Sequence, residues 1–169
     1  MKIPFYQLFY HLVWATKNRE PLLSPSVEPV ILGFLRSKAI GLGGVLFALN
    51  CIVDHVHMVV AIPPSIAVAK FVGQVKAVAS TKFNKSGTGG AFFWQEEYGA
   101  FSFDSKRLPN YIAYVERQKE HHAQGSTIPI LERTSGEGVV RIGESAGLYV
   151  VNEAAWRAEL ESMAGVQPD

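Results

Sequence analysis

Two histidines separated by one apolar residue are the most suggestive chemical feature of the chain. His55 and His57 stand at the start of an apolar run, with Val56 between them. In a β-strand successive side chains alternate between the two faces, so both imidazoles point the same way. Such a pair can bind a divalent metal ion but supplies only two ligands, so a third must come from elsewhere in the fold. The alternative, which an isolated pair favours, is two strand histidines with ordinary hydrogen bonds.

A tyrosine and a glutamine form the second candidate group. Tyr114 and Gln118 are four residues apart in an expected helix, so they lie on one face, one turn apart. A tyrosine hydroxyl with a pKa of about 10 is a poor nucleophile at neutral pH. It becomes useful when a metal activates the electrophile and when a phosphotyrosine conserves the energy of a phosphodiester. The glutamine carbonyl is a suitable third ligand for Mg²⁺ or Mn²⁺. The alternative is a partly buried tyrosine with a polar tip beside a surface glutamine.

Composition limits the class of protein. The chain has 169 residues, 48% of them hydrophobic and 18% charged, which is typical of one compact domain. Its net charge of +1 means that a nucleic-acid binder must concentrate its cations locally. The single cysteine, Cys51, excludes an internal disulfide and fits a reducing compartment. We find no signal peptide and no apolar run of membrane-spanning length, so we expect a cytoplasmic protein without a membrane partner.

The hydrophobic patterns that must position these side chains predict seven elements in the order β-α-β-β-α-β-α. The expected strands are residues 5–15, 45–51, 55–62 and 92–103, and the expected helices are 24–39, 65–84 and 106–122. The first six elements match the α+β, ferredoxin-like split βαβ arrangement, a four-stranded antiparallel sheet with two helices on one face. The seventh is an appended helix that carries Tyr114. We expect residues 123–169 to be a partly irregular extension, with a helix only at 156–163, and not an independent domain.

Four segments, in this order and at this spacing, carry a family resemblance. They are residues 10–19 (YHLVWATKNR), 54–57 (DHVH), 93–101 (FWQEEYGAF) and 114–122 (YVERQKEHH). The chain resembles the single-tyrosine HUH transposases of bacterial insertion sequences, a group that includes the REP-associated tyrosine transposases. The resemblance covers about residues 5–122 and implies that 1–122 is the catalytic domain. It departs at Val53, where such sequences often have proline, and after Gly125, where the segment matches no familiar tail.

The resemblance implies a site and a reaction. His55, His57 and Gln118 would bind Mg²⁺ or Mn²⁺, and Tyr114 would attack a scissile phosphate in single-stranded DNA at hairpin-containing element ends. A 3′-hydroxyl would leave and a 5′-phosphotyrosine would form, so strands rejoin without nucleotide hydrolysis, in agreement with the absence of a P-loop motif. Such an enzyme would act in the cytoplasm, associated with the nucleoid.

Basic residues scattered along the chain are the candidates for DNA contact. Each alone is an ordinary solvated charge, but together they would form a track for phosphates, with acidic residues segregated in the extension. The expected DNA-binding residues are Lys17, Arg19, Lys76, Lys82, Lys106 and Arg107.

The expected working form is a homodimer whose active sites are shared in trans. The first strand is apolar and aromatic along its length, and at a sheet edge it would be an aggregation hazard unless it were covered or paired with a second copy. The resemblance implies the same arrangement. A monomer that works in cis is the alternative.

Two other functions stay open from the residues alone. A zinc-dependent hydrolase would use His55 and His57 with Cys51 or His11 to activate water, without a covalent intermediate. A non-catalytic module would bind single-stranded DNA with the same fold. A covalent protein–DNA adduct, its loss in Tyr114→Phe and the metal that restores activity would separate the three.

Overall fold

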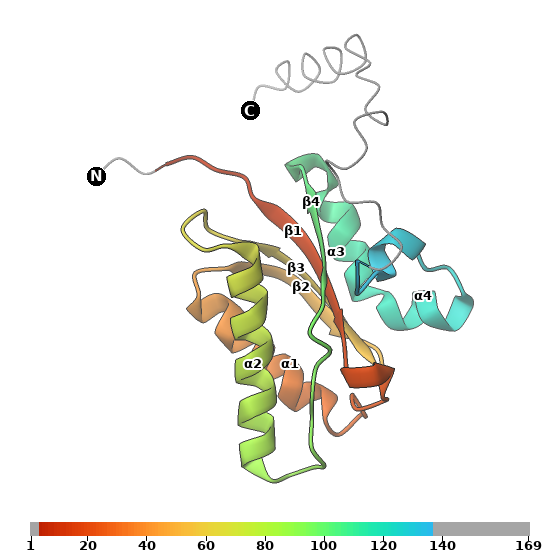
Figure 1. Ribbon diagram of the computed structural model, residues 1–169. Helices are drawn as coiled ribbons and strands as arrows, with labels where there is room; N and C mark the ends of the chain where they lie inside the picture. The colour runs from red at the N-terminus through yellow and green to blue at the C-terminus, as the bar shows by residue number, and fades with distance from the viewer. Residues whose placement is uncertain (1–3, 137–169) are drawn as a thin grey trace. The chain divides into compact units, whose positions relative to one another are not determined.

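A four-stranded antiparallel sheet forms the centre of the protein (Figure 1). The computed structural model describes residues 4–136. Its strands are β1 (Phe9–Ala15), β2 (Val45–Cys51), β3 (His55–Ala61) and β4 (Gly99–Phe103), in the spatial order β2-β3-β1-β4. Every neighbouring pair is antiparallel. This order confirms the predicted α+β, ferredoxin-like arrangement.

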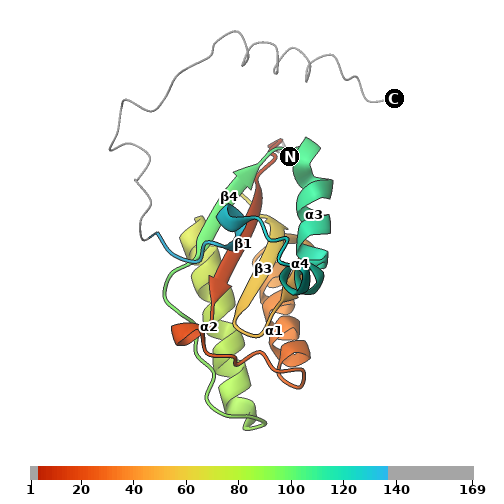
Figure 2. The same ribbon diagram turned by 90° about the vertical axis from the view of Figure 1, so that its right-hand side faces the viewer.

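Helices cover both faces of the sheet. The helices α1 (Glu28–Gly41) and α2 (Val68–Ser86) pack on one face, and α3 (Leu108–Glu116) and α4 (Gln118–Gln124) lie on the other (Figures 1 and 2). The alternation along β3 divides its side chains between the two layers. Val56, Met58 and Val60 belong to the main core with α1 and α2. His55 and His57 therefore face α3 and α4.

The first strand is central in the sheet. β1 pairs with β3 on one side and with β4 on the other, and residues from Leu12 to Ala15 are fully buried. The aggregation hazard considered for an edge strand therefore does not arise. One of the two arguments for a dimer falls with it, because a strand that is paired on both sides needs no second copy to cover it.

The expected last helix is interrupted. Arg117, with φ −100° and ψ 20°, lies between α3 and α4, and a 3₁₀ turn η2 (Ser105–Arg107) precedes α3. Gly125 ends α4 with a φ of 67°, a left-handed conformation that favours glycine. The chain then returns across the sheet face through residues 126–134, which include the 3₁₀ turn η3 (Pro129–Glu132) (Figure 2). We call residues 126–134 the return segment.

The return segment packs closely on the sheet. A Cβ added at Gly99 of β4 would lie 2.1 Å from the backbone oxygen of Arg133, so only glycine allows this approach. Leu131 and Thr134 are buried, and Arg19 Nη2 donates a hydrogen bond to Thr134 Oγ1 at 3.2 Å. The expected helix at 156–163 lies outside the described residues.

Other boundaries differ from the sequence prediction. β4 is shorter than expected, and Trp94 forms only an isolated bridge with Thr16 before it. A short 3₁₀ turn, η1 (Lys17–Arg19), follows β1. Within residues 4–136, no helix has the length and apolar character needed to cross a bilayer.

Lys76 has an internal role that the sequence did not indicate. Its side chain is buried on α2, and its ammonium group donates to the backbone oxygens of residues 95, 96 and 97 at 2.6, 3.0 and 3.1 Å. Burial lowers the pKa of Lys76 to about 8. The ammonium group therefore binds the loop before β4. In this structure it makes an internal contact in place of the expected contact with DNA.

We expect Lys76→Met to lower the free energy of unfolding by about 2 kcal/mol, because the apolar stem survives while three carbonyls lose their donor. Lys85→Met, at an exposed position on the same helix, should change it by less than about 0.5 kcal/mol. Urea unfolding measures both. A stable Lys76→Met variant with weakened DNA binding would contradict the structural role.

Candidate active site

The paired histidines are buried on the α3 side of the sheet. His55 is 3% exposed and His57 is fully buried. Their Nε2 atoms both point at one carboxylate oxygen, Glu132 Oε2, at 3.0 Å from His55 and 3.1 Å from His57. The expectation that both imidazoles share one face of a strand is confirmed by these contacts. The two imidazoles do not line an open cleft, because the return segment covers them.

The opposite ring nitrogens of this pair are held by the protein. His55 Nδ1 lies 2.7 Å from Asp54 Oδ1, and Arg19 Nη1 lies 3.2 Å from the same nitrogen. The closer carboxylate is the acceptor that fixes a proton on Nδ1. His57 Nδ1 lies 2.9 Å from His11 Nε2. Such contacts orient metal-binding imidazoles and leave Nε2 free for the metal.

Burial keeps two of these imidazoles neutral. It lowers the pKa of His11 to about 3, with a further contribution from His57. Burial also lowers the pKa of His57, although hydrogen bonding to Glu132 opposes this. A neutral imidazole is the form that binds a metal.

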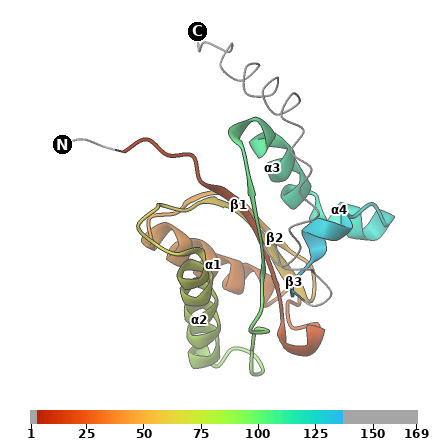
Figure 3. The same ribbon diagram turned by 45° about the horizontal axis from the view of Figure 1, so that its top comes forward.

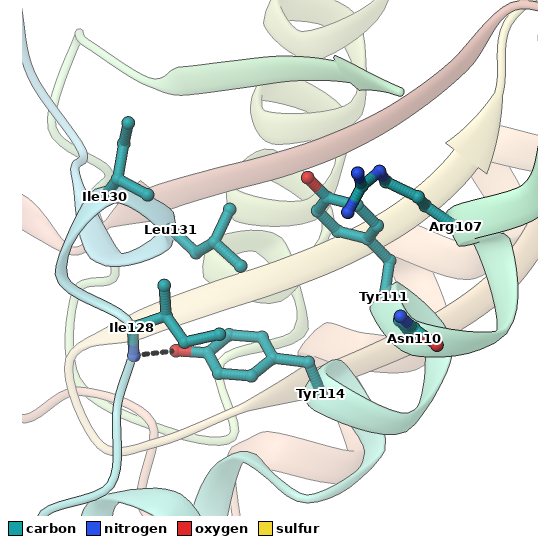
Figure 4. A pocket seen from close by; sticks show the side chains of 7 residues that line it. All are labelled: Arg107, Asn110, Tyr111, Tyr114, Ile128, Ile130 and Leu131. Carbon is teal, nitrogen blue, oxygen red and sulfur yellow. Dashed lines mark hydrogen bonds between the residues drawn. The ribbon is translucent and has the colours of Figure 1, made fainter. Parts of the chain in front are cut away.

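Tyr114 lies on α3 and faces the histidines of its own chain. Its ring centroid is 6.2 Å from that of His57. Its hydroxyl group donates a hydrogen bond to Glu132 Oε1 and accepts one from the backbone N–H of Ile128 at 3.0 Å (Figure 4). Burial, together with the hydrogen bond to Glu132, raises the pKa of Tyr114 to about 12. An unassisted phenol at this position is protonated at neutral pH and is a weak nucleophile.

Gln118 begins α4 and is fully buried, so it is not the surface glutamine of the alternative interpretation. Its Nε2 donates to the backbone oxygen of Tyr114 at 3.3 Å. Its Oε1 is buried and has no hydrogen-bond partner within residues 4–136. Buried carbonyl oxygens are normally paired, so an orphaned one near a histidine cluster is a candidate ligand atom.

Two residues near the site had no predicted role. His122 Nε2 lies 3.2 Å from Glu132 Oε2, and one ligand atom from each of His55, His57, His122 and Glu132 lies within 4.8 Å of the others. His122 follows Gln118 by four residues, so helical spacing from Tyr114 could have indicated it. No sequence signal marks Glu132, because its position depends on the turn at Gly125.

Glu132 is an anion at the centre of this cluster. Burial alone would raise the pKa of Glu132, but hydrogen bonds to His55 and His57 outweigh it and hold that pKa well below its usual range. Imidazole nitrogens, a carboxylate and an unpaired carbonyl oxygen together suit a divalent metal ion.

The ligand set of the alternative hydrolase is not assembled. Cys51 belongs to the main core on the α1 and α2 side of the sheet, and burial raises the pKa of its thiol to about 12. His11 directs its Nε2 at His57 Nδ1 and not at the Glu132 oxygen on which His55 and His57 converge.

The structure brings only some of the predicted cations near Tyr114. Arg19 contacts Asp54 and His55, and Lys17 lies beside it in η1. Arg107, next to Lys106, lines a cavity of about 260 Å³ together with Tyr111 and Tyr114 (Figure 4). Lys82 lies on α2, which covers the opposite face of the sheet.

A ferredoxin-like sheet with paired histidines, facing a tyrosine from the helix after its last strand, defines the class of single-tyrosine HUH enzymes. The chain belongs to the IS200-like transposase family, because the family model described as "Transposase IS200 like" matches residues 4–118. The protein is therefore an enzyme, and the resemblance seen in its sequence is confirmed.

Individual relatives agree with this assignment. The chain is 26% identical over 121 residues to the ISDra2 transposase TnpA of Deinococcus radiodurans, covering 68% of this chain and 86% of that protein. It is 30% identical over 71 residues to the transposase of insertion sequence IS200 from Salmonella typhimurium, covering 42% of this chain and 47% of that protein.

Two solved structures share the fold. One, described as a transposase from Deinococcus radiodurans, has a TM-score of 0.55 and 24% identity, over 75% of this chain and 98% of that chain. The other is a REP-associated tyrosine transposase bound to a REP hairpin, with a TM-score of 0.54 and 11% identity, over 75% of each chain. Figure 3 shows the sheet and helices of this protein.

Proposed function

We propose that this transposase cleaves and rejoins single-stranded DNA through a 5′-phosphotyrosine on Tyr114. The observation that carries the proposal is one carboxylate, Glu132, that contacts the Tyr114 hydroxyl through Oε1 and the Nε2 atoms of His55 and His57 through Oε2. The nucleophile and the histidine pair therefore already share one centre, which a phosphate with its several oxygens would also bridge.

The contacts of Tyr114 fix the direction of attack. Its O–H points at Glu132, and one lone pair accepts the N–H of Ile128. The second lone pair is left to form a bond to phosphorus. As that bond forms, the phenol proton passes to Glu132, the bond from phosphorus to the 3′-oxygen breaks, and the 3′-oxygen takes a proton from water. Attack by another 3′-hydroxyl reverses the step and joins strands.

A divalent ion on His55, His57 and Gln118 would supply Lewis-acid stabilisation of the phosphate charge. The neutral form of His57 and the unpaired Oε1 of Gln118 support this set. Because nitrogen ligands suit transition metals better than Mg²⁺, we propose Mn²⁺ as the better of the two expected ions.

Hairpin-containing ends of an element are the proposed substrate. A structural relative is bound to a REP hairpin. In this chain Arg19 contacts His55 and Arg107 lines the cavity beside Tyr114, and Lys17 and Lys106 are their neighbours in η1 and η2. Phosphate contacts of this kind position DNA without reading its sequence. The proposed place of action is the cytoplasm, at the nucleoid.

An adduct assay tests this function. Purified protein is incubated with hairpin-bearing single-stranded oligonucleotides from the DNA beside its gene, with Mn²⁺, with Mg²⁺ or with a chelator. A covalent adduct that survives denaturation, depends on metal and maps to Tyr114 supports the proposal. Cleavage without an adduct would support a hydrolase, and binding without cleavage under every metal would support a non-catalytic module.

The active site is proposed to work within one chain. Tyr114 lies beside His57 of the same chain, and Val115 packs with Val59 of β3 and Ala48 of β2. The expected sharing of sites in trans is not needed to bring the nucleophile to the histidines. Two copies of the chain can still associate with each site complete.

A mixing experiment distinguishes the two arrangements. Tyr114→Phe and the double variant His55→Ala, His57→Ala are each expected to be inactive. If sites are built in cis, every site in the mixture keeps one defect, so the mixture should stay inactive. Cleavage that reappears after subunit exchange would show that sites are shared. Wild-type protein diluted with Tyr114→Phe serves as the control for assembly.

A further inference from the structure

We propose that His122 and Glu132 are ligands of the same metal ion as His55 and His57, and that the Glu132 carboxylate links this ion to the Tyr114 hydroxyl. The inference rests on the proposed function, since it gives the metal site two residues beyond the expected ones. It also makes the return segment a working part of the active site.

The number of contacts on one oxygen is the first argument. Glu132 Oε2 lies 3.0, 3.1 and 3.2 Å from the Nε2 atoms of His55, His57 and His122. A carboxylate oxygen has about two lone pairs, so it cannot accept well-directed hydrogen bonds from three donors. A cation among the four atoms would satisfy all of them at once.

The orientation of the two rings is the second argument. His55 Nδ1 lies 2.7 Å from Asp54 Oδ1 and His57 Nδ1 lies 2.9 Å from His11 Nε2, so the protein holds the far nitrogen of each ring. The two Nε2 atoms are thereby directed at the same oxygen, Glu132 Oε2. Imidazoles that bind metals are typically oriented by a partner on the other ring nitrogen in this way.

The spacing of the atoms is the third argument. Neighbouring ligands on an ion with bonds of about 2.1 Å lie roughly 3.0–3.4 Å apart in octahedral or tetrahedral geometry. The three distances from Glu132 Oε2, between 3.0 and 3.2 Å, fall in this range. Six-coordinate Mn²⁺ with these five protein ligands would keep one position for a phosphate oxygen.

The return segment also positions the nucleophile. It supplies the acceptor for the Tyr114 O–H, through Glu132, and the donor to the Tyr114 oxygen, through Ile128. Glu132 is fixed on both sides in sequence, by buried Leu131 and by Arg133, whose backbone lies against Gly99. Glu132 is therefore a ligand and a positioning residue, and the catalytic unit extends past residue 122 to about residue 134.

The test measures metal affinity without DNA. Metal-free full-length protein is titrated with Mn²⁺ by calorimetry, and free Mn²⁺ is followed by electron paramagnetic resonance. We expect Glu132→Gln and His122→Ala each to weaken Mn²⁺ binding by at least ~10-fold. Glu120→Gln, which makes the same change of charge at an exposed position of α4, should leave the affinity unchanged.

A second measurement separates positioning from general damage. At saturating Mn²⁺, Glu132→Gln should lower kcat for adduct formation and change KM for DNA by less than about threefold, because the DNA-binding surface is intact. Glu132→Asp, which keeps a carboxylate, should recover part of the Mn²⁺ affinity. Circular dichroism of the metal-free protein checks that each variant is folded. If Glu132→Gln does not fold, the Mn²⁺ affinity of Glu132→Asp tests the proposal in its place.

Unchanged or tighter Mn²⁺ binding in Glu132→Gln would overturn the proposal. Tighter binding of single-stranded DNA in the same variant would show that the carboxylate occupies the place of the phosphate and must leave before catalysis. Metal affinity is measured without any reaction, so it can be interpreted even if the phosphotyrosine mechanism fails. The adduct assay can likewise be interpreted if Glu132 proves not to bind the metal.

Discussion

Tyr114→Phe is expected to abolish the covalent DNA adduct and to lower cleavage by roughly 10⁴-fold or more, as removal of a covalent nucleophile does in other enzymes. The ring stays in place against His57 and His121, so the binding of DNA should be nearly unchanged. Without the phenol oxygen, Glu132 Oε1 loses a hydrogen-bond donor, which water can replace. Denaturing gels measure the adduct, and fluorescence anisotropy measures binding.

Tyr111→Phe is the matched control. Tyr111 lies one turn earlier on α3, and its ring stacks on Phe103 with centroids 4.0 Å apart. That stacking does not need the hydroxyl group, so cleavage should stay within about threefold of wild type. Loss of the adduct in Tyr111→Phe, with activity kept in Tyr114→Phe, would show that the nucleophile has been assigned to the wrong residue.

His57→Ala is expected to abolish metal-dependent cleavage and also to destabilise the fold by about 2–4 kcal/mol. The structure buries His57 completely, so its removal leaves a cavity and takes the partner from His11. Urea unfolding and Mn²⁺ titration on the same sample measure the two effects.

Val59→Ala separates stability from metal binding. Val59 is fully buried on the same face of β3, two residues beyond His57, and packs on Val115 of α3. Its truncation should cost about 1–3 kcal/mol while leaving Mn²⁺ affinity unchanged. If His57→Ala keeps wild-type metal affinity and loses only stability, the histidine is structural.

Local patterns were sufficient to predict the order of the elements. A strand rich in β-branched and aromatic residues, or a helix with an apolar stripe, is recognised from residues that are close together in the sequence. The same locality explains why His55 and His57 were placed on one face, and Tyr114 and Gln118 on one side of a helix. The apolar composition of β1 alone did not indicate which strands it pairs with, because pairing with β3 and β4 depends on residues far along the chain.

The features that were missed depend on tertiary contacts. Glu132 reaches the histidines only because the chain reverses at Gly125, and no residue near Glu132 indicates that destination. The acceptors of Lys76 are backbone oxygens of a loop, which have no signature in the sequence. The break at Arg117 has neither glycine nor proline to mark it.

The two-sided burial of β3 has a consequence for how the strand tolerates change. Val56, Met58 and Val60 support the layer with α1 and α2, whereas His55, His57 and Val59 lie under α3 and the return segment. In a saturation library read out separately for protein abundance and for transposition, truncations on both faces would lower abundance, because both sets of side chains are buried. Apolar replacements at the even positions would lower transposition only in step with abundance, whereas replacements of His55 and His57 would lower it further. At position 59, small apolar replacements would lower abundance and also displace the nucleophile helix from the histidines, a phenotype that resembles a catalytic defect although the residue is buried away from DNA.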